Sequence, residues 1–387
     1  LNFRRPTSKY SVSFILIEGI IKMRSLCFLA YYCKEKIMVT LGIETSCDET
    51  AIALYDSNSS QIIAEKVYSQ IDLHAAYGGV VPELASRDHC AKIINVLDQC
   101  MAEFDLKNID QIAYTAGPGL IGALLIGENL AHGLSMSLNK PVVPINHLEA
   151  HLHAPKIDQD IHLDFPFITL LVSGGHSMII KVKELGDYEL LGDTRDDAVG
   201  EAFDKVAKLL NLGYPGGPIL EKIAMQGDSS SFSFPQPMAH SNDCDMSFSG
   251  LKTAVLYAVE KLSTITDQHQ ADIAASFQES ATEILVKKID FALSKNSVKD
   301  IVLAGGVAAN KLLRSKMDSL ADKKNINLHY PPLRHCTDNA AMVAYLGSLY
   351  SEISSYNLVS LVRPRWPLHE LKPVSYTHLT LPTSNSV

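Results

Sequence analysis

Two histidines four residues apart, His147 and His151, indicate a metal site near the middle of the chain. On a helix they share one face, with about 5–6 Å between their Cβ atoms, which suits a single divalent ion. In the zinc-peptidase pattern a glutamate directly follows the first histidine. Here the glutamate is Glu149, which a helix turns roughly 200° away from His147. The spacing therefore favours a metal that holds an anionic substrate over one that hydrolyses a peptide.

A third ligand for this ion would be a carboxylate or another histidine. His153 lies off the shared face. Asp338 follows the pair Pro331-Pro332 and, like Thr337, is a predicted helix N-cap. Capping alone would account for Asp338, so at this point it is a candidate ligand with a structural alternative. Two histidines and a carboxylate suit iron and zinc equally.

Glycine-bearing turns indicate a nucleotide. In Ser173-Gly174-Gly175 the absent side chains let backbone N–H groups point at an anion. Gly305-Gly306 stand between a predicted strand and a predicted helix, whose N-terminus would face the same ligand. Each pair alone is more often only structural, but the two together favour nucleotide binding. No Walker A loop or Gly-x-Gly-x-x-Gly turn occurs in the right context, which excludes the P-loop and Rossmann classes.

Two acidic residues could bind a ribose. Glu201 and Asp204 are three residues apart and share a helix face, so they could accept its two hydroxyl groups. The alternative is a solvated acidic face paired with Lys205 and Lys208. Gly217, in the turn that follows this helix, could let a base approach the backbone.

The elements that position these residues occur twice in the same order. Each run is predicted to contain three strands, helical sequence, a further strand and a helix, which indicates a duplicated α/β unit with two lobes and a central cleft. In the first run the strands are 39–43, 51–55, 62–68 and 112–115, and the helices are 81–104 and 121–138. In the second run the strands are 168–172, 177–182, 188–191 and 301–304, and the helices are 198–210, 251–262, 271–293 and one from about 308.

The composition is that of a folded protein with real cores. The chain has 387 residues, of which 47% are hydrophobic and 20% charged, and this excludes a disordered or fibrous protein. The net charge of −9 means that any nucleic-acid contact must come from a local basic patch or a partner. The seven cysteines are irregularly spaced, without a Cys-x-x-Cys motif, which favours a reducing cytoplasm. No uncharged stretch reaches the length of a membrane span.

Both ends of the chain are expected to be foreign to the fold. The apolar patch within residues 1–37 is interrupted by charges and lacks a small-residue cleavage site, so it does not predict a signal peptide. Regular sequence begins at Met38, which is the expected start. Residues 373–387 are rich in Ser, Thr and Leu without a period, and are expected to be an extraneous tail.

Six ordered motifs resemble those of the bacterial TsaD family, also called Gcp. They are 41–50 (LGIETSCDET), 147–151 (HLEAH), 171–176 (LVSGGH), 200–205 (GEAFDK), 247–253 (SFSGLKT) and 305–310 (GGVAAN). The resemblance runs from about Met38 to Leu368. It implies a duplicated fold of the actin, sugar-kinase and Hsp70 type. The first lobe would be 38–146, completed by a C-terminal helix over 338–366, and the second lobe would be 147–337.

The resemblance also implies an acyltransferase. Family members transfer threonylcarbamoyl from threonylcarbamoyl-AMP to N6 of adenosine 37 in tRNAs that read codons beginning with A, and release AMP. The expected cofactor is one iron(II) or zinc per subunit. The expected partners are tRNA, a TsaB-like protein and the ATPase TsaE or a relative of it, with no membrane.

Carried over by motif, the resemblance assigns individual residues. The metal ligands would be His147, His151 and Asp338. Asp48 and Glu49 would be catalytic, and which of them is the base stays open. The donor would contact Leu171, Val172, Ser173, Gly174, Gly175, Asp204, Gly217 and Asn310. Cys47 is expected to be a turn residue rather than a nucleophile. Gln236 stands where the family commonly has arginine, which weakens any basic contact there.

Two rival functions fit parts of the pattern. The same architecture serves regulatory ATPases of the actin and Hsp70 type, and a metallopeptidase is less favoured because of the position of Glu149. Several cations are candidate phosphate contacts for tRNA, although each run is more often only a solvated face. They are Lys311, Arg314, Lys316, Lys323, Lys324, Arg363 and Arg365.

Overall fold

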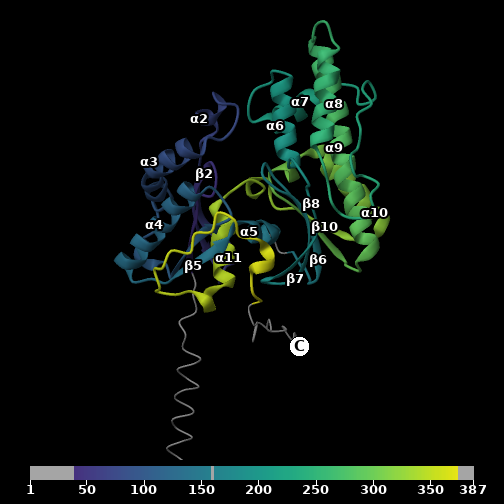
Figure 1. Ribbon diagram of the computed structural model, residues 1–387. Helices are drawn as coiled ribbons and strands as arrows, with labels where there is room; N and C mark the ends of the chain where they lie inside the picture. Colours follow the sequence, from purple (N-terminus) through teal and green to yellow (C-terminus); the bar gives the residue numbers. More distant parts are fainter. Residues whose placement is uncertain (1–38, 158–160, 374–387) are drawn as a thin grey trace, which may run out of the picture.

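The computed structural model describes residues 39–157 and 161–373, which form two α/β lobes (Figure 1). Each lobe is built on a five-stranded sheet. The first sheet contains β1 (Val39–Glu44), β2 (Glu49–Asp56), β3 (Gln61–Ser69), β4 (Gln111–Gly117) and β5 (Val142–Asn146). The second contains β6 (Phe167–Val172), β7 (Ser177–Glu184), β8 (Asp187–Asp193), β9 (Asp300–Ala304) and β10 (Asn327–His329).

The two sheets have the same topology. Their strand orders are β3-β2-β1-β4-β5 and, read from the equivalent edge, β8-β7-β6-β9-β10. In each, the first strand pairs antiparallel with the second and parallel with the fourth. Both first strands, β1 and β6, are almost wholly buried and end in a tight turn that carries family motifs. The duplication expected from the sequence is confirmed.

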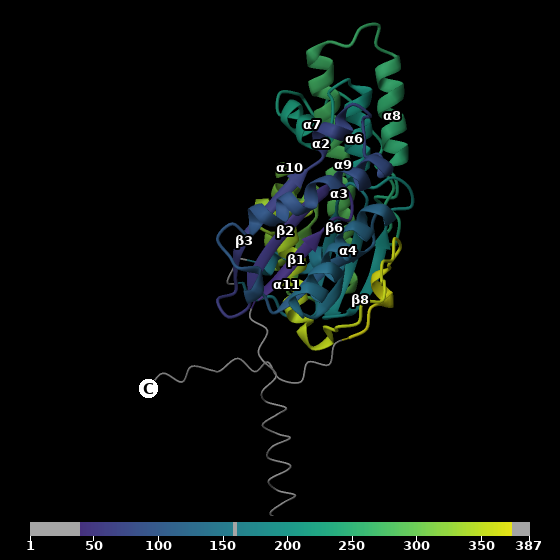
Figure 2. The same cartoon turned by 90° about the vertical axis from the view of Figure 1, so that its left-hand side faces the viewer.

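Helices cover both faces of the first sheet. They are α3 (Pro82–Cys100), α4 (Ile121–Leu138) and, from the far end of the chain, α11 (Ala340–Leu349), while the short α2 (Ile71–Ala75) follows β3. Figure 2 shows α3 and α4 in front of the sheet. Val96 and Leu97 of α3 belong to the same buried hydrophobic cluster as Leu41 of β1. On the other face α11 lies so close to β1 that a Cβ on Gly42 would come 2.4 Å from the carbonyl oxygen of Ala340. Glycine is therefore required at this crossing.

The second lobe carries most of the helical mass. Its helices are α6 (Val199–Leu209), α7 (Gly216–Ala224), α8 (Ser249–Glu260), α9 (Asp267–Lys295) and α10 (Lys311–Lys324). Buried side chains of α6, α9 and α10, among them Phe203, Phe277 and Leu313, pack with Ile168 and Leu303 of the sheet. Helix α7 was not predicted, because its nine residues begin with Gly216, Gly217 and Pro218, which have low helix propensity.

Two predicted helices differ from the structure in extent. The helix expected over 338–366 ends at Leu349, because the following chain runs alongside the first lobe: Ser355 exchanges two backbone hydrogen bonds with Val142, and Arg363 donates to Ala116. The helix expected from about residue 308 begins at Lys311. Gly306–Ala309 forms a 3-10 turn before it, and the side chain of Asn310 caps it.

The short helix α5 (His147–His153) connects the lobes. Ala150 packs in the core beside α11, whereas Leu148 and Leu152 pack with Phe167 and Leu171 of the second lobe. The predictions for 1–37 and 373–387 fall, except at residue 373, outside the described residues. Within the described ranges, none of the helices has the length and apolar character needed to cross a membrane.

Candidate active site

Three side chains from two distant segments meet between the lobes. Nε2 of His151 lies 3.0 Å and Nε2 of His147 lies 3.5 Å from the same oxygen, Oδ1 of Asp338. The donor atoms of the three all lie within 4.8 Å of one another. The histidines leave α5 on one face, as their spacing predicts, and Asn146 starts that helix by accepting hydrogen bonds from the amides of Leu148 and Glu149.

Asp338 is available because a different residue caps the last helix. The cap of α11 is Asn339, whose side chain accepts the amide of Met342. The prediction that Thr337 or Asp338 fills this position is therefore wrong by one or two residues. Because Asn339 satisfies the helix end, the Asp338 carboxylate is directed at the two histidines instead. His153 does not join them, because its Nε2 lies 3.1 Å from the Tyr188 hydroxyl.

Glu44, which sequence reasoning left without a role, supports His147 from behind. Its Oε2 lies 3.0 Å from Nδ1 of His147 and accepts the Thr115 hydroxyl at 2.6 Å, and its Oε1 accepts the amide of Ser46. Glu44 has no exposed surface. A carboxylate at the end of a buried strand requires such partners. The position of Glu44 at the end of the apolar strand β1 was therefore the sequence signal that could have indicated a role for it.

The charges of the cluster stabilise one another. Burial opposes ionisation of Asp338, but the two histidines hold the pKa of that carboxyl well below its usual value. Burial likewise opposes the charge on His147, yet Asp338 and Glu44 raise its pKa well above the ordinary value. A site of this kind favours a cation, whether a proton or a metal ion.

The donor set fits a divalent metal. Two imidazoles and a carboxylate are ligands for zinc and iron(II), and the donor atoms of these three residues lie within 4.8 Å of one another. The Glu44 contact to Nδ1 leaves Nε2 of His147 as the ligating nitrogen. Nδ1 of His151 is buried and has no hydrogen-bond partner among the described residues.

Asp48, in the turn between β1 and β2, and Glu49, the first residue of β2, lie near this cluster. Burial, followed by the negative charges of Asp338 and Asp48, raises the pKa of Glu49 well above its usual value. Burial also raises the pKa of the neighbouring Cys47 thiol, which therefore stays protonated at neutral pH. The turn is held by His89 of α3, whose Nε2 lies 3.0 Å from the Cys47 carbonyl oxygen.

The glycine turns of the second lobe lie together at the end of β6. Gly305 has φ +90°, and a Cβ on it would come 2.3 Å from the carbonyl oxygen of Val172. The amide of Gly200, in the first turn of α6, donates to the carbonyl of Ser173. The Ser173 hydroxyl oxygen accepts the amides of His176 and, more weakly, Gly175. The Gly175 amide, which was expected to face an anion, is thus directed at Ser173 itself.

The residues predicted to bind the adenosine part are only partly brought together. Asp204 accepts the amide of Gly216 at 2.7 Å and that of Gly217, while its burial raises its pKa. Asn310 is used internally, since it caps α10 and donates to Gln278. Glu201 does not join Asp204 but pairs with Lys205 at 2.8 Å, which is the structural alternative weighed for it.

Comparison with known proteins identifies the family. Residues 61–345 match the family model described as TsaD: tRNA N6-adenosine threonylcarbamoyltransferase. The chain belongs to the TsaD family. A tRNA N6-adenosine threonylcarbamoyltransferase of Chromobacterium violaceum is 48% identical over 343 residues, 87% of this chain and 100% of that protein. The corresponding protein of Methylobacillus flagellatus is 49% identical over 340 residues, 86% of this chain and 99% of that one.

Solved structures confirm the fold class. HypF of T. kodakarensis superposes with a TM-score of 0.54 at 18% identity, over 81% of this chain and 48% of that one. Full-length HypF in its phosphate- and nucleotide-bound form gives a TM-score of 0.55 at 12% identity, over 82% of this chain and 47% of that one. At these identities the likeness concerns the fold alone. The two-lobed, actin-like α/β class and the transferase family expected from the sequence are confirmed.

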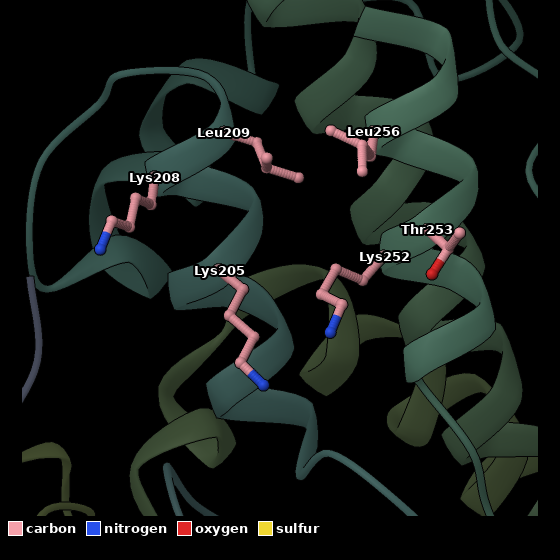
Figure 3. Close-up of a pocket in the computed structure, with 6 residues that line it drawn as sticks. All are labelled: Lys205, Lys208, Leu209, Lys252, Thr253 and Leu256. Carbon is pink, nitrogen blue, oxygen red and sulfur yellow. The ribbon is translucent and has the colours of Figure 1, made fainter. Parts of the chain in front are cut away.

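Two TsaD-family motifs meet around a cavity of about 310 Å³ between α6 and α8. In Figure 3, Leu209 and Leu256 face each other across it. Its other lining residues are Lys205, Lys208, Lys252 and Thr253. Asp197 accepts both Lys205 and Lys252, at 2.8 and 3.0 Å, which joins the two motifs by ion pairs. Part of the motif at 247–253 is therefore structural.

The cations considered for tRNA are mostly engaged within the TsaD-family chain. Lys316 pairs with Glu279 at 2.6 Å, and Lys324 with Asp290 at 2.6 Å. The Arg363 guanidinium contacts Glu370. Arg314 donates to the carbonyl of Ala308 and lies over the ring of Tyr330. Gln236, where an arginine was expected, accepts from Lys287.

Proposed function

We propose that this chain transfers threonylcarbamoyl from threonylcarbamoyl-AMP to N6 of adenosine 37 in tRNAs that read codons beginning with A, with release of AMP. The convergence of His147, His151 and Asp338 carries the proposal, in a chain whose family model and relatives bear the name of this transferase. The position of Glu149 argues against a peptidase, because Tyr188 and Tyr350 hold its carboxylate.

The proposed reaction needs orientation and charge stabilisation rather than a protein nucleophile. The exocyclic amine of adenine is weakly nucleophilic, because its lone pair is delocalised into the ring. A mixed carbamic-phosphoric anhydride compensates for this weakness. N6 bonds to the carbamoyl carbon, the bond from that carbon to the phosphate oxygen breaks, AMP leaves with the electron pair, and N6 loses a proton. Holding both reactants in register supplies much of the acceleration.

His147, His151 and Asp338 would hold one iron(II) or zinc ion, which would supply positive charge beside phosphate or carbamoyl oxygens. The lowered pKa of Asp338 keeps that carboxyl ionised and able to bind a cation throughout the neutral range. Glu44 fixes the ring of His147, so the ligating nitrogen is presented without reorganisation.

The donor is proposed to lie along the end of β6 in the second lobe. Its contacts would be Leu171, Val172, Ser173, Gly174 and Gly175, with Asp204, Gly217 and Asn310 at the adenosine part. The packing of Gly305 on Val172 and the hydrogen bonds from Gly216 and Gly217 to Asp204 support this placement. The exposed Gly174 and Gly175, whose Cβ positions meet no atom within 4 Å, leave room for a ligand.

Asp48 or Glu49 is proposed to take the proton that N6 loses. The raised pKa of Glu49 makes its carboxylate a stronger base than that of an ordinary glutamate. The protonated Cys47 thiol is unsuited to nucleophilic attack. On the strength of the family alone, we extend the proposal to TsaB-like and TsaE-like partners and to a cytoplasmic location.

Depletion of the protein in cells tests this function. Mass spectrometry of nucleosides from total tRNA should show loss of threonylcarbamoyl-adenosine, restored by the wild-type chain and not by the His147→Ala/His151→Ala variant. Unchanged threonylcarbamoyl-adenosine after depletion would contradict the proposal and favour a regulatory ATPase. Casein digestion by the zinc-loaded chain would instead favour the peptidase.

A further inference from the structure

Glu149 is a buried carboxylate that contacts both lobes at once. It lies on α5 with 1% of its surface exposed. Its Oε1 accepts the hydroxyl of Tyr188 at 2.5 Å and the hydroxyl of Tyr350. Tyr188 belongs to β8 of the second sheet, whereas Tyr350 directly follows α11 and packs in the core of the first lobe. A single oxygen therefore receives one hydrogen bond from each lobe.

The contacts of Tyr188 extend this arrangement. Its hydroxyl oxygen accepts the amide of Gly186 at 3.2 Å and lies 3.1 Å from Nε2 of His153. The phenol can thus accept from its own strand turn while it donates to Glu149. His153, the last residue of α5, therefore contacts the same hydroxyl group that donates to Glu149. A buried carboxylate is tolerated where hydrogen bonds replace its water, and this site provides them.

Helix α5 depends on such contacts for its orientation. It has only seven residues, and a helix this short has little stability of its own. Glu149 points away from the face that carries His147 and His151, two residues to either side. Rotation of α5 that moved the histidines from Asp338 would also pull Glu149 from both phenols. The two faces of the helix are thus fixed together.

We propose that Glu149 is a positioning residue. By accepting Tyr188 and Tyr350 from opposite lobes, it holds α5 so that His147 and His151 face Asp338. This role rests on the proposed metal site, but the contacts themselves do not involve a metal. It gives the glutamate of the HLEAH motif a function other than that of a base.

Conservative tyrosine variants of the full chain test the role. Tyr188→Phe and Tyr350→Phe each remove one hydroxyl and leave the ring. Tyr114→Phe is the matched control, because the Tyr114 hydroxyl also donates to a buried carboxylate, Glu128, but within the first lobe. Thermal unfolding of each variant identifies the temperature range in which all are folded, and the comparisons are made there.

Zinc affinity, measured by competition with a chromophoric chelator, is the first readout. We expect Tyr188→Phe and Tyr350→Phe to weaken it about tenfold, and Tyr114→Phe to leave it unchanged. The second readout is hydrogen–deuterium exchange of peptides covering 147–153 in the metal-free protein. Exchange should rise in the first two variants and not in the control.

The outcomes separate the two proposals. Unchanged zinc affinity in both Tyr188→Phe and Tyr350→Phe would overturn the positioning role, and so would an equal loss in the control. If the wild-type chain itself binds no zinc or iron(II), the proposed metal function fails. In that case hydrogen–deuterium exchange of the peptides covering 147–153 still tests whether Glu149 holds α5. Unchanged exchange in both tyrosine variants would overturn the positioning role.

Discussion

Nδ1 of His147 lies 3.0 Å from Oε2 of Glu44, on the opposite side of the ring from Asp338. The imidazole is therefore held between two carboxylates. Because Glu44 is wholly buried and also accepts Thr115 and Ser46, it cannot turn away without losing several hydrogen bonds. It sets both the orientation of the ring and the nitrogen that faces the cluster.

Replacing Glu44 should weaken metal binding. We expect Glu44→Gln to lower the affinity for zinc about 10- to 100-fold, as losses of ligand-supporting partners typically do. Equilibrium competition with a chelator gives the affinity. Glu128→Gln is the control, since Glu128 is a buried carboxylate of the same lobe with its own hydroxyl partners. Equal affinities for Glu44→Gln and the wild type would show that the contact does not support the ligand.

Removal of metal should lower the melting temperature. A ligand that binds only the folded state stabilises it by about 2.7 kcal/mol at 100 times its Kd. Calorimetry with added zinc and with excess chelator should show this difference for the wild-type chain and none for Asp338→Asn. A shift of the same size in Asp338→Asn would mean that zinc acts elsewhere on the chain.

Transfer kinetics should distinguish the roles of Asp48 and Glu49. Asp48→Asn and Glu49→Gln are compared with the wild type in single-turnover transfer from threonylcarbamoyl-AMP to tRNA. Loss of the residue that takes the proton should slow transfer about 10²- to 10⁴-fold without changing the melting temperature. Normal rates in both variants would show that neither Asp48 nor Glu49 takes the proton.

His89 should make the chain less stable in acid. Burial lowers its pKa in the folded protein, so the folded state resists a proton that the unfolded state accepts near pH 6.5. The stability from neutral His89 is complete above that pH and declines as the pH falls toward the folded-state pKa. Urea unfolding of the wild type should lose up to about 1.4 kcal/mol more per pH unit than that of His89→Gln. Parallel pH profiles would refute this.

The isolated chain should bind tRNA weakly. The net charge is −9, and Lys316, Lys324 and Arg363 are already paired with acidic residues. We expect a Kd no tighter than about 10⁻⁶ M at physiological salt, measured by fluorescence anisotropy, and tighter binding with TsaB-like and TsaE-like partners. Nanomolar binding by the chain alone would be inconsistent with this charge distribution.

Local patterns predicted the parts of the site that lie within one element. The i, i+4 spacing placed His147 and His151 on one face, and the strand–turn–strand patterns gave the start of both lobes. Family motifs supplied Asp338 as the partner, although it lies 187 residues from His151. Asp338 is free to face the histidines because Asn339 caps α11. Sequence spacing could not decide whether Thr337, Asp338 or Asn339 is the cap.

Most of the failures came from tertiary contacts that local patterns do not contain. Residues 354–366 are an exception, because their Ser, Asn, Val and Pro residues have low helix propensity. Their backbone pairs with Val142 and Ala116 instead of forming the expected helix. Glu201 and Asp204 share a helix face, yet Lys205 and Gly216 take their carboxylates separately. Glu44 was overlooked because its three partners come from different segments.

The position of α5 and Asp338 in the chain has a topological consequence. The second lobe is an insertion between β5 and α11 of the first, and the ligands lie at its two junctions: His147 and His151 where the chain leaves the first lobe, and Asp338 where it returns. A metal ion there would close the whole insertion into a ring, as a disulfide would. The conformational entropy of the unfolded insertion would then fall. Release of the ion would break the link between the two junctions and restore that entropy.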